Sequence, residues 1–118
     1  MLARLLGLVL LATIATFSYA ADWIPLKRDS DIREILTDKL VVYAGEKSIT
    51  QTFNSDGSTV YTDDRPSYGK WKVSGGQYCS QWPPSESWAC FDIFAGFDND
   101  KIRFVSDAGQ EWNARIAD

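Results

Sequence analysis

Residues 70–93 read KWKVSGGQYCSQWPPSESWACFDI, and this stretch decides the fold. On both sides of Gly75-Gly76, apolar and polar residues alternate, which is the pattern of two antiparallel strands joined by a two-residue turn. The turn sets Val73 opposite Tyr78. We therefore expect a β-hairpin with one apolar face and one polar face.

The two cysteines in this stretch, Cys79 and Cys90, are the only ones in the chain. We expect them to form one disulfide between facing positions of neighbouring strands, which sets Tyr78 opposite Phe91. In this register both cysteines lie on the polar, outward face, and the disulfide is a surface staple. In the chain-entropy model such a bond contributes about 3 kcal/mol.

The register extends to the strands that follow. A turn at residues 96–100 sets Phe91 opposite Phe104. The same alignment places Asp92 opposite Arg103 and predicts an ion pair between them. Because a slip by one residue exchanges the two faces of a strand, the agreement over five strands supports this register. The apolar face consists of Trp71, Val73, Tyr78, Phe91, Ile93, Ile102, Phe104, Trp112 and Ile116.

One helix is predicted, over residues 27–39. Ser30 or Asp29 can cap it by accepting hydrogen bonds from the free N–H groups of the first turn. Apolar residues between Ile32 and Leu40 recur at helical spacing and form one face. We therefore expect an N-terminal amphipathic helix that packs on the sheet.

The rest of the chain reads as short strands separated by turn residues at intervals of about ten, which is typical of an antiparallel meander. The sequence therefore predicts a mainly β, α+β fold in which the helix packs on a curved antiparallel sheet of seven or eight strands. The sheet is either half-open or closed into a small barrel. The predicted strands are residues 40–43, 48–53, 58–62, 68–73, 77–82, 88–94, 101–105 and 110–116.

The first 20 residues have the organisation of an export signal. Arg4 supplies a positive charge, residues 5–17 are apolar, and small residues precede a cleavage site after Ala20. An uncleaved anchor is the alternative, but the apolar run is shorter than the roughly 20 residues that span a bilayer. We expect residues 21–118 to be a single exported domain, periplasmic or secreted, with no membrane segment once the signal is removed.

Composition argues against several classes of function. The formal net charge is −4, becomes more negative when Arg4 leaves, and is spread along the chain, so nucleic acid is not expected as a partner. The chain has no histidine, which removes imidazole-based catalysis and most transition-metal sites. Acidic groups at residues 98–100 and at Asp56, Asp63 and Asp64 resemble calcium ligands in composition only, and hairpin turns explain them. We expect no cofactor and no metal.

The loop at residues 82–88 is the first candidate binding site. Trp82 and Trp88 flank the double proline of Pro83 and Pro84, and the disulfide clamps the base of the loop. Such a loop is preorganised, which lowers the entropy lost on binding, and tryptophan is a common anchor of protein interfaces. The first hypothesis is a non-catalytic interaction module that binds an unknown protein partner through these four residues and Glu86. The bland alternative is that both tryptophans only cover the core and the disulfide.

Several sequence landmarks resemble a group of small exported bacterial proteins of unknown function. Glycine-x-tryptophan strands also open lipocalin-like barrels, and that resemblance implies a small apolar ligand inside the barrel. The landmarks, within residues 40–116, are Phe53-x-x-Asp56-Gly57, Gly69-x-Trp71-x-Val73, Cys79, Cys90 and Asp107-x-Gly109.

A lipocalin-like carrier is therefore the second hypothesis. We expect little free room in such a barrel, because the large apolar side chains are about as many as eight short strands need to fill their interior. The lining of the carrier is expected to be Phe53, Tyr61, Trp71, Tyr78, Phe91, Phe104 and Trp112.

A small hydrolase with a pair of carboxylates, for instance Glu86 and Asp92, is the third hypothesis. No acidic residue lies in an apolar context that would raise its pKa. We therefore do not expect an enzyme. We also expect the protein to be a monomer.

Overall fold

The structure is a computed structural model that describes residues 22–98 and 100–117. The predicted export signal, residues 1–20, lies outside the described residues. The described elements are β1 (Trp23–Leu26), α1 (Asp29–Leu36), β2 (Leu40–Tyr43), β3 (Thr50–Phe53), β4 (Ser58–Asp63), β5 (Arg65–Ser74), β6 (Gln77–Gln81), β7 (Ala89–Gly96), β8 (Lys101–Ser106) and β9 (Glu111–Ile116).

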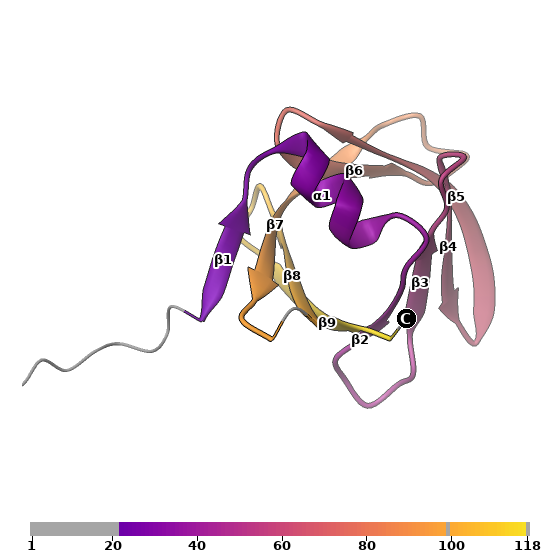
Figure 1. The fold of residues 1–118 in the computed structure, drawn as a ribbon. Helices are drawn as coiled ribbons and strands as arrows, with labels where there is room; N and C mark the ends of the chain where they lie inside the picture. Colours follow the sequence, from indigo (N-terminus) through magenta and orange to yellow (C-terminus); the bar gives the residue numbers. More distant parts are fainter. Residues whose placement is uncertain (1–21, 99, 118) are drawn as a thin grey trace, which may run out of the picture.

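Strands β2 to β9 form a closed, eight-stranded antiparallel barrel (Figure 1). Each of these strands pairs with its neighbour in sequence, and β2 pairs with β9 to close the barrel, with Val41 opposite Ile116. The mainly β fold is therefore confirmed, and of the two predicted forms the structure has the barrel. All eight predicted strands are present, with ends that differ by three residues at most.

One strand was not predicted. Residues 23–26, which read as a short apolar lead-in, form β1 and pair with the C-terminal half of β7. The pairing is available because β6 covers only the N-terminal half of β7, with Tyr78 opposite Phe91 and Ser80 opposite Ala89. Strand β1 thus pairs with the part of β7 that β6 leaves unpaired.

The helix is shorter than predicted, and its caps differ. It ends at Leu36 because Thr37 is extended and Asp38 has a positive φ of 62°, and the N–H of Asp38 donates to the carbonyl of Phe53. At the other end Arg28 is the N-cap, without a side-chain cap bond. The carboxylate of Asp29, an expected cap, instead accepts a hydrogen bond of 2.7 Å from the Gly76 N–H.

Helix α1 lies across one end of the barrel and closes it (Figure 1). Its Ile32 and Leu36 side chains are fully buried and belong to the same apolar cluster as Val41, Phe53 and Ile93. Ile35 packs against this cluster from a partly buried position. The core of the protein therefore sits at the helix end of the barrel.

The predicted register is correct around the disulfide and wrong at the next hairpin. Tyr78 lies opposite both Val73 and Phe91, as expected. Between β7 and β8, however, Phe91 lies opposite Ser106 and not Phe104, because the turn sits further along the chain. The shift is two residues, so each side chain still faces the predicted side.

The predicted ion pair between Asp92 and Arg103 is wrong as a result of this shift. Arg103 instead donates from Nε to the side-chain oxygen of Asn113 at 2.7 Å and lies 3.6 Å from a carboxylate oxygen of Glu111. Asp92 accepts a hydrogen bond from the amide of Gln77 at 3.1 Å.

The Cys79–Cys90 disulfide is present, with facing positions on β6 and β7. Both cysteines lie on the outward face, as predicted, but the disulfide is not a fully exposed staple, since Cys79 is only 2% exposed and Cys90 is half-buried. Lys72 lies opposite Cys79 on the outer face of the barrel, and its ammonium sits 4.2 Å from the ring centre of Trp88. A lysine and a tryptophan thus pair by a cation–π contact beside the disulfide.

Candidate functional site

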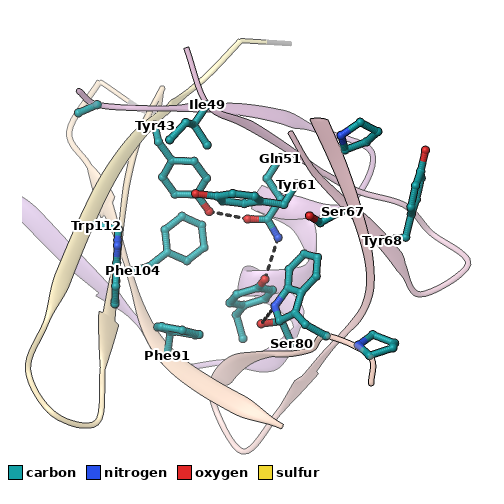
Figure 2. Close-up of a pocket in the computed structure, with 15 residues that line it drawn as sticks. Tyr43, Ile49, Gln51, Tyr61, Ser67, Tyr68, Ser80, Phe91, Phe104 and Trp112 are labelled. Atoms are coloured by element: carbon teal, nitrogen blue, oxygen red, sulfur yellow. Dashed lines mark hydrogen bonds between the residues drawn. The ribbon is translucent and has the colours of Figure 1, made fainter. Parts of the chain in front are cut away.

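The end of the barrel opposite α1 holds a cavity of about 820 Å³ (Figure 2). Aromatic side chains dominate its wall, and they come from strands on all sides of the barrel. None of the residues that line the cavity carries a charge. The aromatic wall includes Tyr43, Tyr61, Trp82, Phe91, Phe104 and Trp112.

The expectation that apolar side chains fill the barrel is wrong. The cavity exists because the large side chains are unevenly distributed along the barrel axis. Phe53 and Trp71, two of the seven expected lining residues, pack with the helix in the core, their ring centres 5.6 Å apart. The other five do line the cavity: Tyr61, Tyr78, Phe91, Phe104 and Trp112.

The floor of the cavity is a chain of uncharged polar groups centred on Gln51. This residue is 3% exposed. Its carboxamide oxygen accepts a hydrogen bond of 2.6 Å from the Tyr43 hydroxyl (Figure 2). Its amide nitrogen donates to Thr59 Oγ1 at 2.9 Å and to the Tyr78 hydroxyl at 3.0 Å. The bond to Tyr78 crosses the barrel interior, since β3 and β6 are not adjacent strands.

Both tyrosines of the floor hold their protons tightly. Burial raises the pKa of Tyr43 well above its usual value of 10.0, and the nearby Tyr78 and Tyr61 add to the effect. Burial also raises the pKa of Tyr78, although hydrogen bonds with Ser80 and Gln51 offset part of this rise. The floor is therefore uncharged at neutral pH.

The raised pKa values of these two tyrosines predict that the protein loses stability at alkaline pH. An unfolded tyrosine ionises near pH 10.0, whereas Tyr43 and Tyr78 in the folded state ionise at higher pH. Above about pH 10 the folded state binds more protons than the unfolded state, so the free energy of unfolding falls as the pH rises. Below about pH 10 the two tyrosines are protonated in both states, and the free energy of unfolding keeps its full value. Urea unfolding followed by circular dichroism between about pH 8 and pH 11 measures this slope.

The Tyr43→Phe variant should show a shallower alkaline slope than the wild type, because one of the two shifted groups is gone. Tyr68→Phe is the matched control, since this tyrosine is 69% exposed. Equal slopes for Tyr43→Phe and the wild type would contradict the prediction.

Trp82 reaches the cavity because its neighbour on β5 is a glycine. A Cβ atom added to Gly69 would lie 2.5 Å from Cε3 of the Trp82 ring and 2.7 Å from the Gln81 carbonyl oxygen. The indole N–H of Trp82 donates to Ser80 Oγ at 3.1 Å, which further fixes the ring. The glycine of the glycine-x-tryptophan landmark therefore makes room for a second tryptophan.

Gly69→Ala should displace Trp82 and lower the free energy of unfolding by about 1–3 kcal/mol, as overpacking does. Part of the clash is with backbone, which a change of rotamer cannot relieve. Urea unfolding gives the stability, and the tryptophan fluorescence spectrum reports the displaced ring. Ser67→Ala, two positions earlier on β5, is the control and should change neither.

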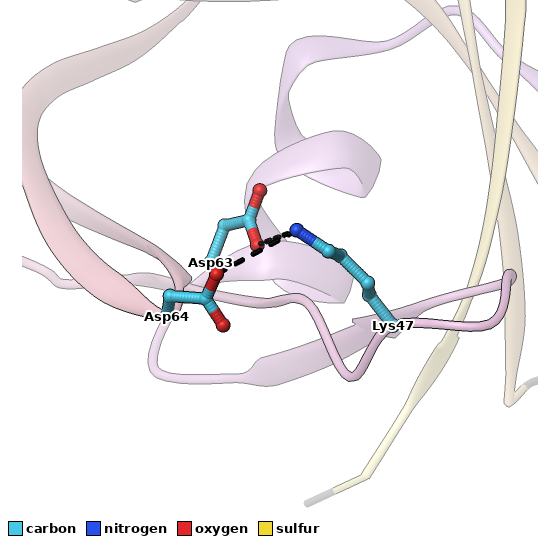
Figure 3. Close-up of polar contacts among 3 residues, drawn as sticks. All are labelled: Lys47, Asp63 and Asp64. Atoms are coloured by element: carbon cyan, nitrogen blue, oxygen red, sulfur yellow. Dashed lines mark hydrogen bonds and ion pairs between the residues drawn. The ribbon is translucent and has the colours of Figure 1, made fainter.

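Lys47, Asp63 and Asp64 form an ion-pair cluster (Figure 3). The ammonium of Lys47 is 3.3 Å from a carboxylate oxygen of Asp63 and 3.6 Å from one of Asp64. It joins the loop at residues 44–49 to the turn between β4 and β5. Lys47 and Asp64 are well exposed and Asp63 is partly exposed, and such pairs contribute about 0–1 kcal/mol. The cluster therefore adds little to the stability of the fold.

The candidate loop at residues 82–88 is divided between two faces. Trp82 and Pro83 line the cavity, whereas Pro84 and Glu86 are exposed to solvent. Trp88 lies on the outer face against Lys72 and is 37% exposed.

The sequence reasoning missed Gln51, Tyr43 and Ser80 as site residues. A usable signal was present for Gln51. In the predicted strand at residues 48–53 it alternates with Phe53, which places a polar side chain on the apolar face. Its partner across the barrel could not be foreseen, because Tyr78 lies three strands away.

The carboxylates offer no catalytic pair within the cavity. Glu86 and Asp92 are both exposed, and neither lines the cavity. The pKa of Asp56 is lowered by hydrogen bonds from Ser58, as expected of a turn residue. Among residues 22–98 and 100–117, no three or more Cys, Asp or Glu side chains gather as metal ligands, and no helix is long and apolar enough to cross a membrane.

Comparison with known proteins gives no further guide. No protein-family model, no curated protein and no solved structure matches the chain. The functional conclusion therefore rests on the geometry of the cavity.

Proposed function

We propose that the protein is a non-catalytic carrier that reversibly binds a small, largely apolar molecule in the open end of its barrel, in the manner of a lipocalin-like protein. The observation that carries this proposal is the cavity of about 820 Å³ with its aromatic, uncharged lining. Ligand pockets occupy roughly 300–1,000 Å³ and combine apolar walls with a few polar groups. The Gln51 network supplies those groups here.

An exported location fits this role. The Cys79–Cys90 disulfide is the kind of bond that persists outside the reducing cytosol. We infer that the carrier works in the periplasm or after secretion, as residues 1–20 also suggest.

Binding of a partner protein by the loop at residues 82–88 is the second candidate. The exposure of Trp88 and of the Pro84–Glu86 tip favours it. Trp82, however, points into the cavity and is half of the expected anchor pair. Replacing Trp88 with serine should abolish capture of a protein partner if this candidate is right, and should leave binding in the cavity unchanged.

The carrier is tested with the neutral aromatic probe N-phenylnaphthylamine, whose fluorescence rises in apolar surroundings. We expect saturable binding with energy transfer from the tryptophans of the cavity wall. Ser67→Trp fills space at the wall (Figure 2) and should weaken binding at least about tenfold, or about 1.4 kcal/mol.

Ser74→Trp is the matched control, because Ser74 is exposed on the same strand outside the cavity. It should leave the dissociation constant unchanged. No saturable binding by the folded wild type, or equal weakening by both variants, would overturn the proposal.

A further inference from the structure

We propose that the cavity selects neutral, planar molecules that carry a hydrogen-bond acceptor, and that the Tyr78 hydroxyl donates to this acceptor. The inference rests on the proposed function, since it names the class of ligand for the same cavity. It follows from the directions of the hydrogen bonds in the floor and from the charges that line the wall.

The orientation of the Gln51 carboxamide is fixed by Thr59. The only hydrogen on Thr59 Oγ1 is donated to the carbonyl of Thr52 at 2.6 Å. Thr59 must therefore accept from Gln51, which places the amide nitrogen toward Thr59 and Tyr78 and the oxygen toward Tyr43. Both amide hydrogens are then used, one on Thr59 and one on Tyr78.

Tyr78 consequently accepts from Gln51 and keeps its own hydrogen. The Ser80 hydroxyl is the other polar neighbour of Tyr78, and its bond lowers the pKa of Tyr78, as a bond donated to the phenolic oxygen does. Ser80 Oγ itself already accepts from the Trp82 indole at 3.1 Å. Among the described residues the Tyr78 hydrogen is therefore left without an acceptor, although Tyr78 is only 3% exposed and lines the cavity. A buried donor without an acceptor is unfavourable. A ligand whose hydrogen-bond acceptor reaches the floor relieves this penalty. The Tyr78 hydroxyl therefore favours ligands that carry an acceptor over ligands that do not.

The chain of donors runs in one direction, from Tyr43 through Gln51 to Tyr78. Hydrogen bonds aligned in this way polarise one another and strengthen the last donor. Tyr61 also lines the cavity, and among residues 22–98 and 100–117 its hydroxyl has no hydrogen-bond partner, but it is partly exposed and water can satisfy it. Tyr78 is therefore the donor whose partner decides affinity.

The charge of the ligand follows from the lining. A carboxylate or an ammonium group loses its hydration on entering the cavity, and no lining residue offers the opposite charge. Aromatic walls favour planar rings by stacked and edge-to-face contacts. A neutral aromatic ketone meets these conditions, whereas its hydrocarbon analogue lacks the acceptor and an acid carries a charge.

The test uses three probes that share one rigid three-ring skeleton: fluorenone, fluorene and fluorene carboxylate. Their binding is followed by quenching of tryptophan fluorescence in the wild type, Tyr78→Phe and Tyr61→Phe. We expect Tyr78→Phe to weaken fluorenone about five- to tenfold more than it weakens fluorene, as loss of one hydrogen bond does. Tyr61→Phe should change both probes equally, and the carboxylate should bind more weakly than fluorenone.

The infrared carbonyl stretch of bound fluorenone provides a readout that needs no folded variant. We expect it below the frequency measured in cyclohexane, because the Tyr78 hydroxyl donates to the carbonyl. An unshifted band, equal effects of Tyr78→Phe on fluorenone and fluorene, or tight binding of the carboxylate would overturn the inference and leave the carrier standing. If neither neutral probe binds to the folded wild type, the carrier itself is refuted and the inference with it.

Discussion

Phe53→Ala is expected to lower the free energy of unfolding by about 3–5 kcal/mol. Phe53 is fully buried, and its ring centre lies 5.6 Å from that of Trp71 and 5.5 Å from that of Tyr78, edge to face in both cases. It also stacks with Phe104 at 6.4 Å. Removing the ring leaves a void between the helix end of the barrel and the floor of the cavity.

Urea unfolding near neutral pH measures the effect. Because a small domain has only about 5–15 kcal/mol of net stability, the variant should be close to unfolding at room temperature. Tyr68→Ala is the matched control, since this aromatic side chain is 69% exposed and should change stability by less than about 0.5 kcal/mol. A similar small change for Phe53→Ala would mean that the core is not packed as described.

Loss of the disulfide should have the second-largest effect, a decrease of about 3 kcal/mol. Cys79 and Cys90 are 11 positions apart, and their bond restricts the unfolded chain over that loop. Alanine at both positions is the appropriate replacement, because Cys79 is buried and serine would add an unsatisfied hydroxyl.

Unfolding of the double variant is compared with that of the wild type with and without a reductant. The reduced wild type and the double variant should lose similar stability, and the reductant should leave the double variant unchanged. An unaltered unfolding midpoint after complete reduction would show that the bond does not constrain the unfolded chain.

Much of the barrel could be predicted because local pattern and one covalent bond specify it. The Gly75-Gly76 turn has positive φ at both residues, as a two-residue hairpin requires, and the Cys79–Cys90 pair fixes the next strand. Where no such marker exists, at residues 96–100, the predicted register was wrong by two residues. Alternation alone cannot detect a shift by an even number of positions.

The cavity could be predicted less well than the strands. Volume depends on how side chains distribute along the barrel axis, and composition carries no information about that distribution. Phe53 and Trp71 share the apolar face with Phe91 and Trp112, yet the first pair packs with α1 and the second lines the cavity. The two pairs differ because the helix fills only one end of the barrel, so that aromatic side chains at the other end are left to line the cavity.

The barrel closes through the pairing of β2 with β9, so it can close only after β9, its last strand, has been synthesised. Both β2 and β8 take β9 as a partner, so a nascent chain that lacks residues 111–116 presents two unpaired edges. Contacts between strands so distant in sequence form slowly, because a long stretch of chain must first be brought together. A chain that has not yet completed residues 111–116 therefore cannot close the barrel, and both of its open edges stay available for pairing with another strand.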